Sequence, residues 1–217
     1  MKITWLGHAA VKIEGSKTIY IDPFLTGNPS ASQTAEEIQK ADVVIVTHDH
    51  GDHLGDAFPI CKRTGATLVA MHEIAVDAQA QSICAEGMNI GGTVEACGVK
   101  VHMVTAFHSA DRGDPAGTVV EMDGKTLYHA GDTGLTYDMK LVGEFFHPDL
   151  SFIPIGDRYT MGIHSAAKAV EFTQTKKVIP VHYGTFPLIA VDPEAFKSLV
   201  GTRAEVIVLK PGESTSL

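Results

Sequence analysis

Three imidazoles and two carboxylates lie within six consecutive residues, His48-Asp49-His50-Gly51-Asp52-His53. Imidazole nitrogen and carboxylate oxygen are both ligands that zinc and similar divalent ions accept. On a tight turn, His48 and His50 can point to one side. Asp52 and His53 can then point to an adjacent position, so one segment can serve two neighbouring metal ions. Burying so many titratable groups without a partner is costly, which favours a metal site over a solvated loop that happens to contain histidines.

Further ligands must come from elsewhere in the chain, because this segment alone does not complete two metal sites. His108, Asp132 and His182 each stand just beyond a β-like run. Taken singly, such residues are more often exposed or hydrogen-bonded than metal-bound, and their shared position at strand ends is what favours them as ligands. His164 lacks that position, and we expect it to be a surface residue at a helix N-terminus.

The segment that leads into the histidine cluster, residues 41–46, is a mostly apolar run and indicates a buried strand. Short β-like runs separated by turn signals precede it, and alternating strand and helix patterns follow. The second half of the chain repeats this order, with a hairpin turn at Asp123-Gly124. The predicted strands are 3–6, 9–14, 18–21, 41–46, 67–71, 93–96, 99–106, 118–122, 126–129, 150–153, 178–181 and 205–209. The predicted helices are 56–63, 73–85, 138–146, 165–173 and 193–200.

Two halves of similar pattern, roughly 1–90 and 91–217, predict one domain over residues 1–217. The fold class is α/β (α+β), arranged as a four-layer αββα sandwich in which two mixed sheets pack face to face with helices outside. The polar motifs fall at the C-terminal ends of buried strands. Open α/β sheets commonly place their ligands there, so the candidate residues are expected to meet at one edge.

The composition is that of a globular protein with material for a large core, since 44% of the 217 residues are hydrophobic and 20% are charged. A metal is therefore expected to be catalytic rather than a support for the fold. The net charge of -9, with no stretch rich in Lys and Arg, counts against a nucleic-acid partner. Cys61, Cys84 and Cys97 form no CxxC pair, which fits a reducing cytosol, and all three are expected to be buried small apolar residues.

No apolar run is long enough for a signal peptide or for the roughly 20 residues of a membrane span. The expectation is therefore a cytoplasmic protein that acts on a small molecule. Symmetric association is common and has no reliable sequence signature, so a homo-oligomer stays open.

Five motifs, in order and spread over nearly the whole chain, resemble the metallo-β-lactamase superfamily. They are Asp22 at the end of the opening strands, the HxHxDH cluster of residues 48–53, His108, Asp132 and His182. The resemblance implies two divalent metal ions with a water or hydroxide between them. The first ion would be held by His48, His50 and His108. The second would be held by Asp52, His53 and His182, and Asp132 would bridge the two.

Three shorter motifs indicate which branch of this superfamily the chain resembles. Residues 5–9 (Trp-Leu-Gly-His-Ala), 22–24 (Asp-Pro-Phe) and 159–162 (Tyr-Thr-Met-Gly) resemble largely uncharacterised metal-dependent hydrolases. The better understood relatives of that branch resemble ascorbate-phosphate lactonases and the phospholipase D that cleaves N-acyl phosphatidylethanolamine. In this comparison His8 and Asp22 are groups that line the pocket or orient metal-bound histidines.

Departures from other branches of the superfamily point towards hydrolysis. His50 stands where redox di-iron relatives have glutamate, which argues against electron transfer. Asp132 stands where the commonest true β-lactamases have cysteine, which disfavours that activity. The long basic arm of transfer-RNA-processing relatives is missing.

The leading hypothesis is hydrolysis of an ester, lactone or phosphodiester of a small molecule, with zinc as the expected metal and manganese, iron or nickel compatible with the same ligands. Asp132 would fix the spacing of the metals, and Asp52 would bind metal and steer the nucleophile. Asp49 is expected to stabilise its loop. Arg158 would lie near the mouth of the site, where it either pairs with an anionic substrate or stays a solvated surface residue.

Two other hypotheses remain. One is a metal-dependent nuclease or phosphodiesterase, against which the acidic charge balance and the missing arm count. The other is a non-catalytic metal-binding or sensor protein, against which the complete set of candidate ligands counts.

Overall fold

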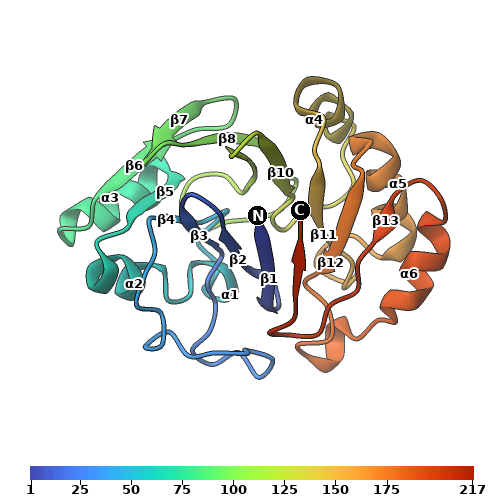
Figure 1. Ribbon diagram of the computed structural model, residues 1–217, viewed down its shortest axis with the longest axis horizontal. Helices are drawn as coiled ribbons and strands as arrows, with labels where there is room; N and C mark the ends of the chain where they lie inside the picture. The colour runs from blue at the N-terminus through green and yellow to red at the C-terminus, as the bar shows by residue number, and fades with distance from the viewer.

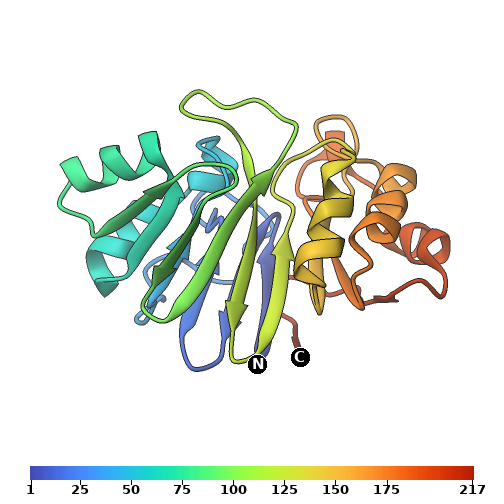
Figure 2. The ribbon, with the colours of Figure 1, turned by 90° about the horizontal axis from the view of Figure 1, so that it is seen from above.

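Two seven-stranded mixed sheets face each other at the centre of the molecule, and helices cover the outer face of each (Figures 1 and 2). The computed structural model describes residues 1–217. This four-layer arrangement confirms the predicted αββα sandwich. The first sheet has the order β14 (Ser214–Ser216), β1 (Lys2–Gly7), β2 (Ala10–Glu14), β3 (Thr18–Ile21), β4 (Val43–Ile45), β5 (Thr67–Met71), β6 (Ala85–Met88). The second has the order β13 (Glu205–Val206), β12 (Lys177–Val181), β11 (Leu150–Pro154), β10 (Lys125–His129), β9 (Ala116–Met122), β8 (Val99–Thr105), β7 (Thr93–Ala96).

The helices lie outside the sheets and are short. The helical segments are α1 (Gly51–Leu54), α2 (Ala57–Thr64), α3 (His72–Ala80), α4 (Asp138–Phe146), α5 (Ile163–Thr173), the 3-10 turn η1 (Pro187–Ile189) and α6 (Pro193–Val200). Figure 2 shows α2 and α3 on one side of the sheet pair and α4, α5 and α6 on the other. None of these helices combines the length and the apolar character needed to cross a membrane.

The core follows from the alternation of side chains along strands that are buried on both faces. In β9, Val119 belongs to the core beneath the second sheet's helices, whereas its neighbour Val120 belongs to the larger core between the sheets. In β11, Ile153 likewise belongs to the core beneath the helices, and its neighbour Phe152 belongs to the larger core. Continuous apolar runs in these strands are therefore explained by two cores, one on each face of the sheet.

Strand direction brings the polar motifs to one edge of the sandwich. β3, β4 and β5 run parallel, as do β10, β11 and β12, and two antiparallel steps make β1 parallel to β3 and β8 parallel to β10. The loops that follow β1, β3, β4, β8, β10 and β12 therefore leave the sheets at their carboxyl ends. These six connections, one of which contains the short helix α1, carry all the candidate ligands and the two candidate supporting residues, His8 and Asp22.

The end of the chain crosses back to the first sheet. β14 pairs with β1, and its register aligns Ile3 with Thr215. The terminal amino group of Met1 donates a hydrogen bond to the Leu217 carbonyl at 3.1 Å, and the Leu217 N–H donates to the Met1 carbonyl at 2.9 Å. Figure 1 shows the two termini side by side. The last strand thus covers an edge of β1 that would otherwise expose unpaired backbone groups.

Several local predictions were wrong. The helix predicted to reach residue 85 ends at Ala80, and residues 85–88 form β6 instead, as an edge strand parallel to β5. The strand predicted to reach residue 209 ends at Val206. β14 and the short helix α1 were not predicted. Of the cysteines, Cys61 is buried as expected, but Cys84 and Cys97 are exposed. Cys84 lies in the connection between α3 and β6, and Cys97 lies in the turn between β7 and β8.

Candidate metal centre

The first group of candidate ligands is His48, His50 and His108, whose ligand atoms all lie within 4.8 Å of one another. His48 Nε2 and His50 Nδ1 are 3.0 Å apart. Burial lowers the pKa of His48 to about 3, so its imidazole is neutral and its lone pair is available. Two imidazoles that turn nitrogen atoms toward one point form a natural site for a cation.

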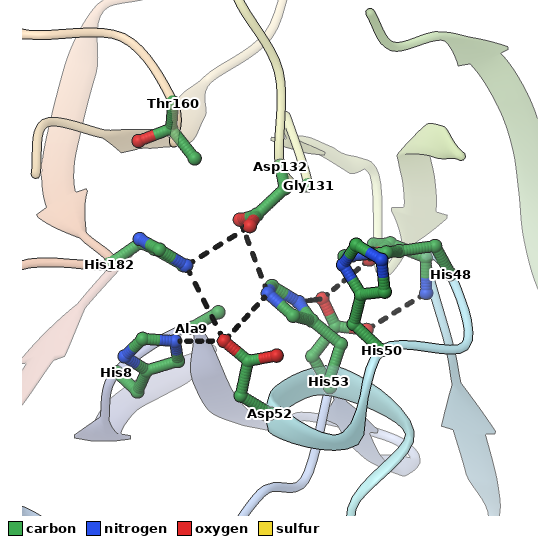
Figure 3. Close-up of polar contacts among 12 residues, drawn as sticks. His8, Ala9, His48, His50, Asp52, His53, Gly131, Asp132, Thr160 and His182 are labelled. Atoms are coloured by element: carbon green, nitrogen blue, oxygen red, sulfur yellow. Dashed lines mark hydrogen bonds and ion pairs between the residues drawn. The ribbon is translucent and has the colours of Figure 1, made fainter. Parts of the chain in front are cut away.

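The second group is built around the carboxylate of Asp52 (Figure 3). Asp52 Oδ2 lies 3.8 Å from His182 Nε2 and 4.0 Å from His53 Nε2. Burial opposes the ionisation of Asp52, but the neighbouring His182 and the hydrogen bond from His8 hold its pKa well below the usual range. Asp52 is therefore a carboxylate at neutral pH and carries the negative charge that a divalent cation requires.

Asp132 lies between the two groups. One carboxylate oxygen is 3.2 Å from His53 Nε2, and the other is 3.0 Å from His182 Nε2 and 3.6 Å from His108 Nε2. Burial disfavours its charged form, but the neighbouring His53 and His182 hold the pKa of Asp132 well below its ordinary value. A buried carboxylate in contact with histidines of both groups is suited to bridge two cations.

Several buried atoms at this point lack a hydrogen-bond partner. They are His53 Nε2, Asp132 Oδ1 and both ring nitrogens of His182. Buried polar atoms are normally satisfied, because an unmade hydrogen bond inside a protein costs about 1–3 kcal/mol. The unsatisfied Nε2 and Oδ1 atoms face each other across gaps that a metal ion would fill. The residues present therefore fit divalent metal ions, with the nitrogen and oxygen ligand set that zinc accepts.

Asp22 fixes the orientation of the histidines from behind. Its Oδ2 accepts from His53 Nδ1 at 2.8 Å and from the Thr47 hydroxyl at 2.7 Å, and its Oδ1 accepts from the Thr47 N–H at 2.8 Å. Since the Thr47 hydroxyl donates to Asp22, it accepts from His48 Nδ1, 3.1 Å away. These contacts place a proton on Nδ1 of both imidazoles and turn Nε2 toward the ligand groups, as in the carboxylate–histidine arrangement of known metal sites.

His8 lies on the other side of Asp52. Its Nε2 is 3.0 Å from Asp52 Oδ2, and its Nδ1 is 2.8 Å from the Thr185 hydroxyl. A carboxylate can only accept, so Nε2 carries the proton and Thr185 donates to Nδ1. Burial lowers the pKa of His8 to about 4, which keeps the ring neutral. Although its nitrogen is close enough to be counted with the second group, these hydrogen bonds assign His8 to orienting Asp52.

Two supporting residues were missed at the level of the sequence. His129 Nε2 donates to the Ala9 carbonyl at 3.0 Å, and its Nδ1 accepts from the Gly131 N–H at 3.1 Å. It therefore ties the turn that carries Asp132 to the opposite sheet. Thr185, described above, was also not singled out. The only sequence signal for His129 was a histidine inside an apolar strand, beside the Gly131 turn.

The remaining candidates belong to none of the ligand groups. Asp49 accepts hydrogen bonds from the Arg112 side chain and from the Asp111 N–H. His164 is exposed on the first turn of α5. Arg158 is also exposed; its Nε donates to the Tyr159 hydroxyl at 3.2 Å, and its guanidinium lies 5.5 Å from the centroid of the Tyr159 ring. Neither His164 nor Arg158 lines a cavity at the site.

Two adjoining cavities open over the ligand groups. The first, which we call the metal cavity, has a volume of about 170 Å³ and is lined by His50, Asp52, His108, Ser109, Asp132, Tyr159 and His182. The second, which we call the apolar cavity, has a volume of about 200 Å³ and is lined by His8, Asp52, Tyr159, His182, Phe186, Leu188 and Ile189. The two share Asp52, Tyr159 and His182, so a single small molecule can occupy both.

Known proteins with the same features were found by sequence and by structure. A family model described as a beta-lactamase superfamily domain matches residues 2–182. A UPF0173 metal-dependent hydrolase of Methanopyrus kandleri is 52% identical, with 99% of each chain covered. One of Archaeoglobus fulgidus is 51% identical over 99% of this chain and 98% of the relative. The solved structure of a metallo hydrolase from Ignicoccus hospitalis superposes with a TM-score of 0.93 at 41% identity, covering 99% of this chain and 97% of the other.

Proposed function

The chain belongs to the beta-lactamase superfamily and is a metal-dependent hydrolase, and we propose that it uses two divalent ions, zinc in the first place, to cleave an ester, lactone or phosphodiester bond of a small molecule. When bound, two such ions supply hydroxide near neutral pH from a water between them and polarise the scissile carbonyl or phosphoryl group. The observation that carries this proposal is the convergence of unsatisfied buried nitrogen and oxygen atoms from separate loops.

The proposed assignment gives each ion its own ligands. His48, His50 and His108 hold the first ion, in support of which their ligand atoms lie within 4.8 Å of one another. The second ion is held by Asp52, His53 and His182. Asp132 bridges the pair, supported by its contacts of 3.0–3.6 Å with histidines of both groups.

The two carboxylates in the metal cavity have different tasks. Asp132 is 3% exposed and is enclosed by histidines, so its role is to set the spacing of the cations. Asp52 has a side chain that is 33% exposed and borders both cavities. It is therefore the group that can accept a proton from the attacking water and return it to a leaving group. The hydrogen bond from His8 holds Asp52 in place for this step.

The test is a hydrolase panel on the full chain loaded with zinc or with manganese. It contains p-nitrophenyl esters, lactones, thioesters, bis(p-nitrophenyl) phosphate and RNA, each with and without chelator. We expect chelator-sensitive hydrolysis of esters, lactones or phosphodiesters and no cleavage of RNA. Cleavage of RNA alone would favour a nuclease, and no hydrolysis of any substrate would refute the proposal.

Metal content tests the dinuclear centre separately. We expect two ions per chain in the wild type and in Glu95→Ala, which removes an exposed carboxylate. Asp132→Ala should lose metal and at least about a hundredfold in kcat/KM, because it removes the shared ligand. Clearly fewer than two ions per chain in every reconstitution, or an Asp132→Ala variant with full metal content and activity, would refute the two-ion centre.

A further inference from the structure

The apolar cavity differs in chemistry from the metal cavity beside it. Three of its lining residues, Phe186, Leu188 and Ile189, are apolar, and they belong to the segment around η1. Neither cavity is lined by a lysine or an arginine. A substrate group in the apolar cavity therefore meets apolar side chains on one side and His8, Asp52 and His182 on the other, with no lysine or arginine to pair with a negative charge.

The apolar wall stays exposed to solvent. Phe186 is 39% exposed and Leu188 is 58% exposed, although side chains of this kind gain free energy when they are buried. Tyr159, which borders both cavities, is 53% exposed. Three large side chains around one concave site form the kind of apolar lining that is typical of small-molecule pockets.

The wall is held in a fixed position. The Gly184 N–H donates to the Ile189 carbonyl at 2.9 Å, and the Ile189 N–H donates to the Phe186 carbonyl at 3.1 Å, which closes the segment into a compact turn. Ile189 itself is buried, and it packs so closely on Gly156 that a Cβ there would lie 3.0 Å from the Ile189 side chain. The cavity is thus preformed, which reduces the entropy lost on binding.

The wall is also joined to the catalytic residues. The Phe186 ring meets the His8 ring edge-on with centroids 5.8 Å apart, and His8 donates to Asp52 at 3.0 Å. A group in the apolar cavity therefore lies next to the carboxylate proposed to handle the proton. The part of the substrate bound here must be close to the scissile bond.

We infer that the apolar cavity binds a compact, uncharged hydrocarbon group beside the scissile bond, so that the substrate class is a neutral carboxylic ester or lactone with a short aliphatic or phenyl substituent. A cavity of about 150 Å³ is enough for benzene, so the volume here suits a group of that size. Phe186 and Leu188 are the specificity-determining residues. This inference rests on the proposed metal-dependent hydrolysis, since the hydroxide and the scissile bond belong to the metal cavity.

The experiment measures binding rather than turnover, with two aliphatic chelators that share one metal-binding head. Acetohydroxamate and butyrohydroxamate differ by two methylenes, and each buried methylene is worth about fourfold in affinity. Calorimetry on the zinc-loaded full chain should show butyrohydroxamate binding roughly tenfold more tightly or better. In Leu188→Asn and in Phe186→Asn this ratio should fall to about threefold or less.

Leu141→Asn is the matched control, because Leu141 is 49% exposed and lines a different cavity, beside α4. Its ratio should equal that of the wild type. Equal affinities for the two hydroxamates in the wild type, or an undiminished ratio in both variants, would overturn the inference and leave the proposed function standing. If neither hydroxamate binds and no ester, lactone or phosphodiester is hydrolysed, the proposed function fails, and the inference fails with it. The expected ratio without hydrolysis of any ester or lactone would support the cavity and refute the bond assignment.

Discussion

Arg112 Nε donates to Asp49 Oδ2 at 3.0 Å and so joins the loop that carries His108 to the segment that carries His48 and His50. The Asp111 N–H donates to the other oxygen of Asp49 at 2.9 Å. The guanidinium also contacts Asp77 of α3, with Nη1 and Oδ2 2.6 Å apart. Asp49 therefore holds a loop from the second sheet rather than only its own turn, and the geometry of the first ligand group depends on it.

Arg112→Ala should weaken the first metal site while the fold is kept. The side chain is 40% exposed, so its loss leaves no cavity, but the loop bearing His108 loses its anchor. Outer groups of this kind are worth about 10–100-fold in metal affinity, and we expect the lower end of that range. Competition with a fluorescent zinc chelator measures it. Arg203→Ala is the control, because Arg203 lies on the surface just after α6 and donates to the backbone carbonyls of Val200 and Leu199; its loss should leave the zinc affinity of both metal sites unchanged. Equal zinc affinities in Arg112→Ala and the wild type would show that the contact between Arg112 and Asp49 does not affect the first metal site.

Asp22→Asn should disturb the second metal site. An amide can donate as well as accept, so it no longer fixes the proton of His53 on Nδ1 and no longer favours the free Nε2 that a metal needs. We expect zinc affinity to fall about 10–100-fold, together with a loss of stability. Asp56→Asn is the control, because Asp56 is another buried carboxylate that accepts from two backbone N–H groups, those of Leu25 and Thr26. It should lose stability without losing zinc affinity in the folded protein.

The fold could be predicted from the sequence wherever local pattern and burial agree. The continuous apolar run leading to Thr47 is a central strand, as its composition indicates. β14 could not be predicted, because Ser214, Thr215 and Ser216 have no apolar alternation and become a strand only by pairing with β1. β6 was not predicted for a similar reason: Glu86 and Gly87 have no apolar alternation and become an edge strand only by pairing with β5.

In the candidate site, too, local sequence patterns predicted some features, and contacts between distant residues determined the others. His48 to His53, His108, Asp132 and His182 could be singled out because each stands at a strand end, and the structure brings them together. The supporting contacts could not be predicted, because they join residues far apart in the chain. His129 and Ala9 are 120 positions apart, and His8 and Thr185 are 177 positions apart. No local spacing encodes such pairs.

Arg158→Ala tests whether an anion is recognised at the mouth of the site. The guanidinium bonds the Tyr159 hydroxyl and stacks on its ring, and it lines neither cavity. We therefore expect KM to change by less than about twofold, the size of a solvated surface charge, for p-nitrophenyl butyrate and for bis(p-nitrophenyl) phosphate alike. A tenfold rise in KM confined to the anionic phosphodiester would contradict this and restore Arg158 as an anion-binding residue.

The metal-free protein should be most stable near pH 6.5. Burial lowers the pKa of His8 to about 4 and that of His48 to about 3. Below pH 6.5 the unfolded chain therefore takes up protons that the folded chain refuses, and the free energy of unfolding falls as the pH falls. His182 acts in the opposite direction. Burial opposes its protonation, but Asp132 raises its pKa to about 9, so its stabilising contribution is complete below pH 6.5 and is lost as the pH rises to about 9.

Zinc should remove the alkaline loss of stability and leave a more stable protein above pH 6.5, because a bound cation replaces the proton of His182 as the partner of Asp132. In the metal-free protein each histidine changes the free energy of unfolding by about 1.4 kcal/mol per pH unit at most. Urea unfolding between pH 5 and 9, with chelator and with zinc, measures both curves. A metal-free curve that is flat or rises from pH 6.5 to 9 would contradict the prediction. So would a zinc-loaded curve that falls as steeply as the metal-free one, because the histidine and the aspartate would then not be sharing a cation.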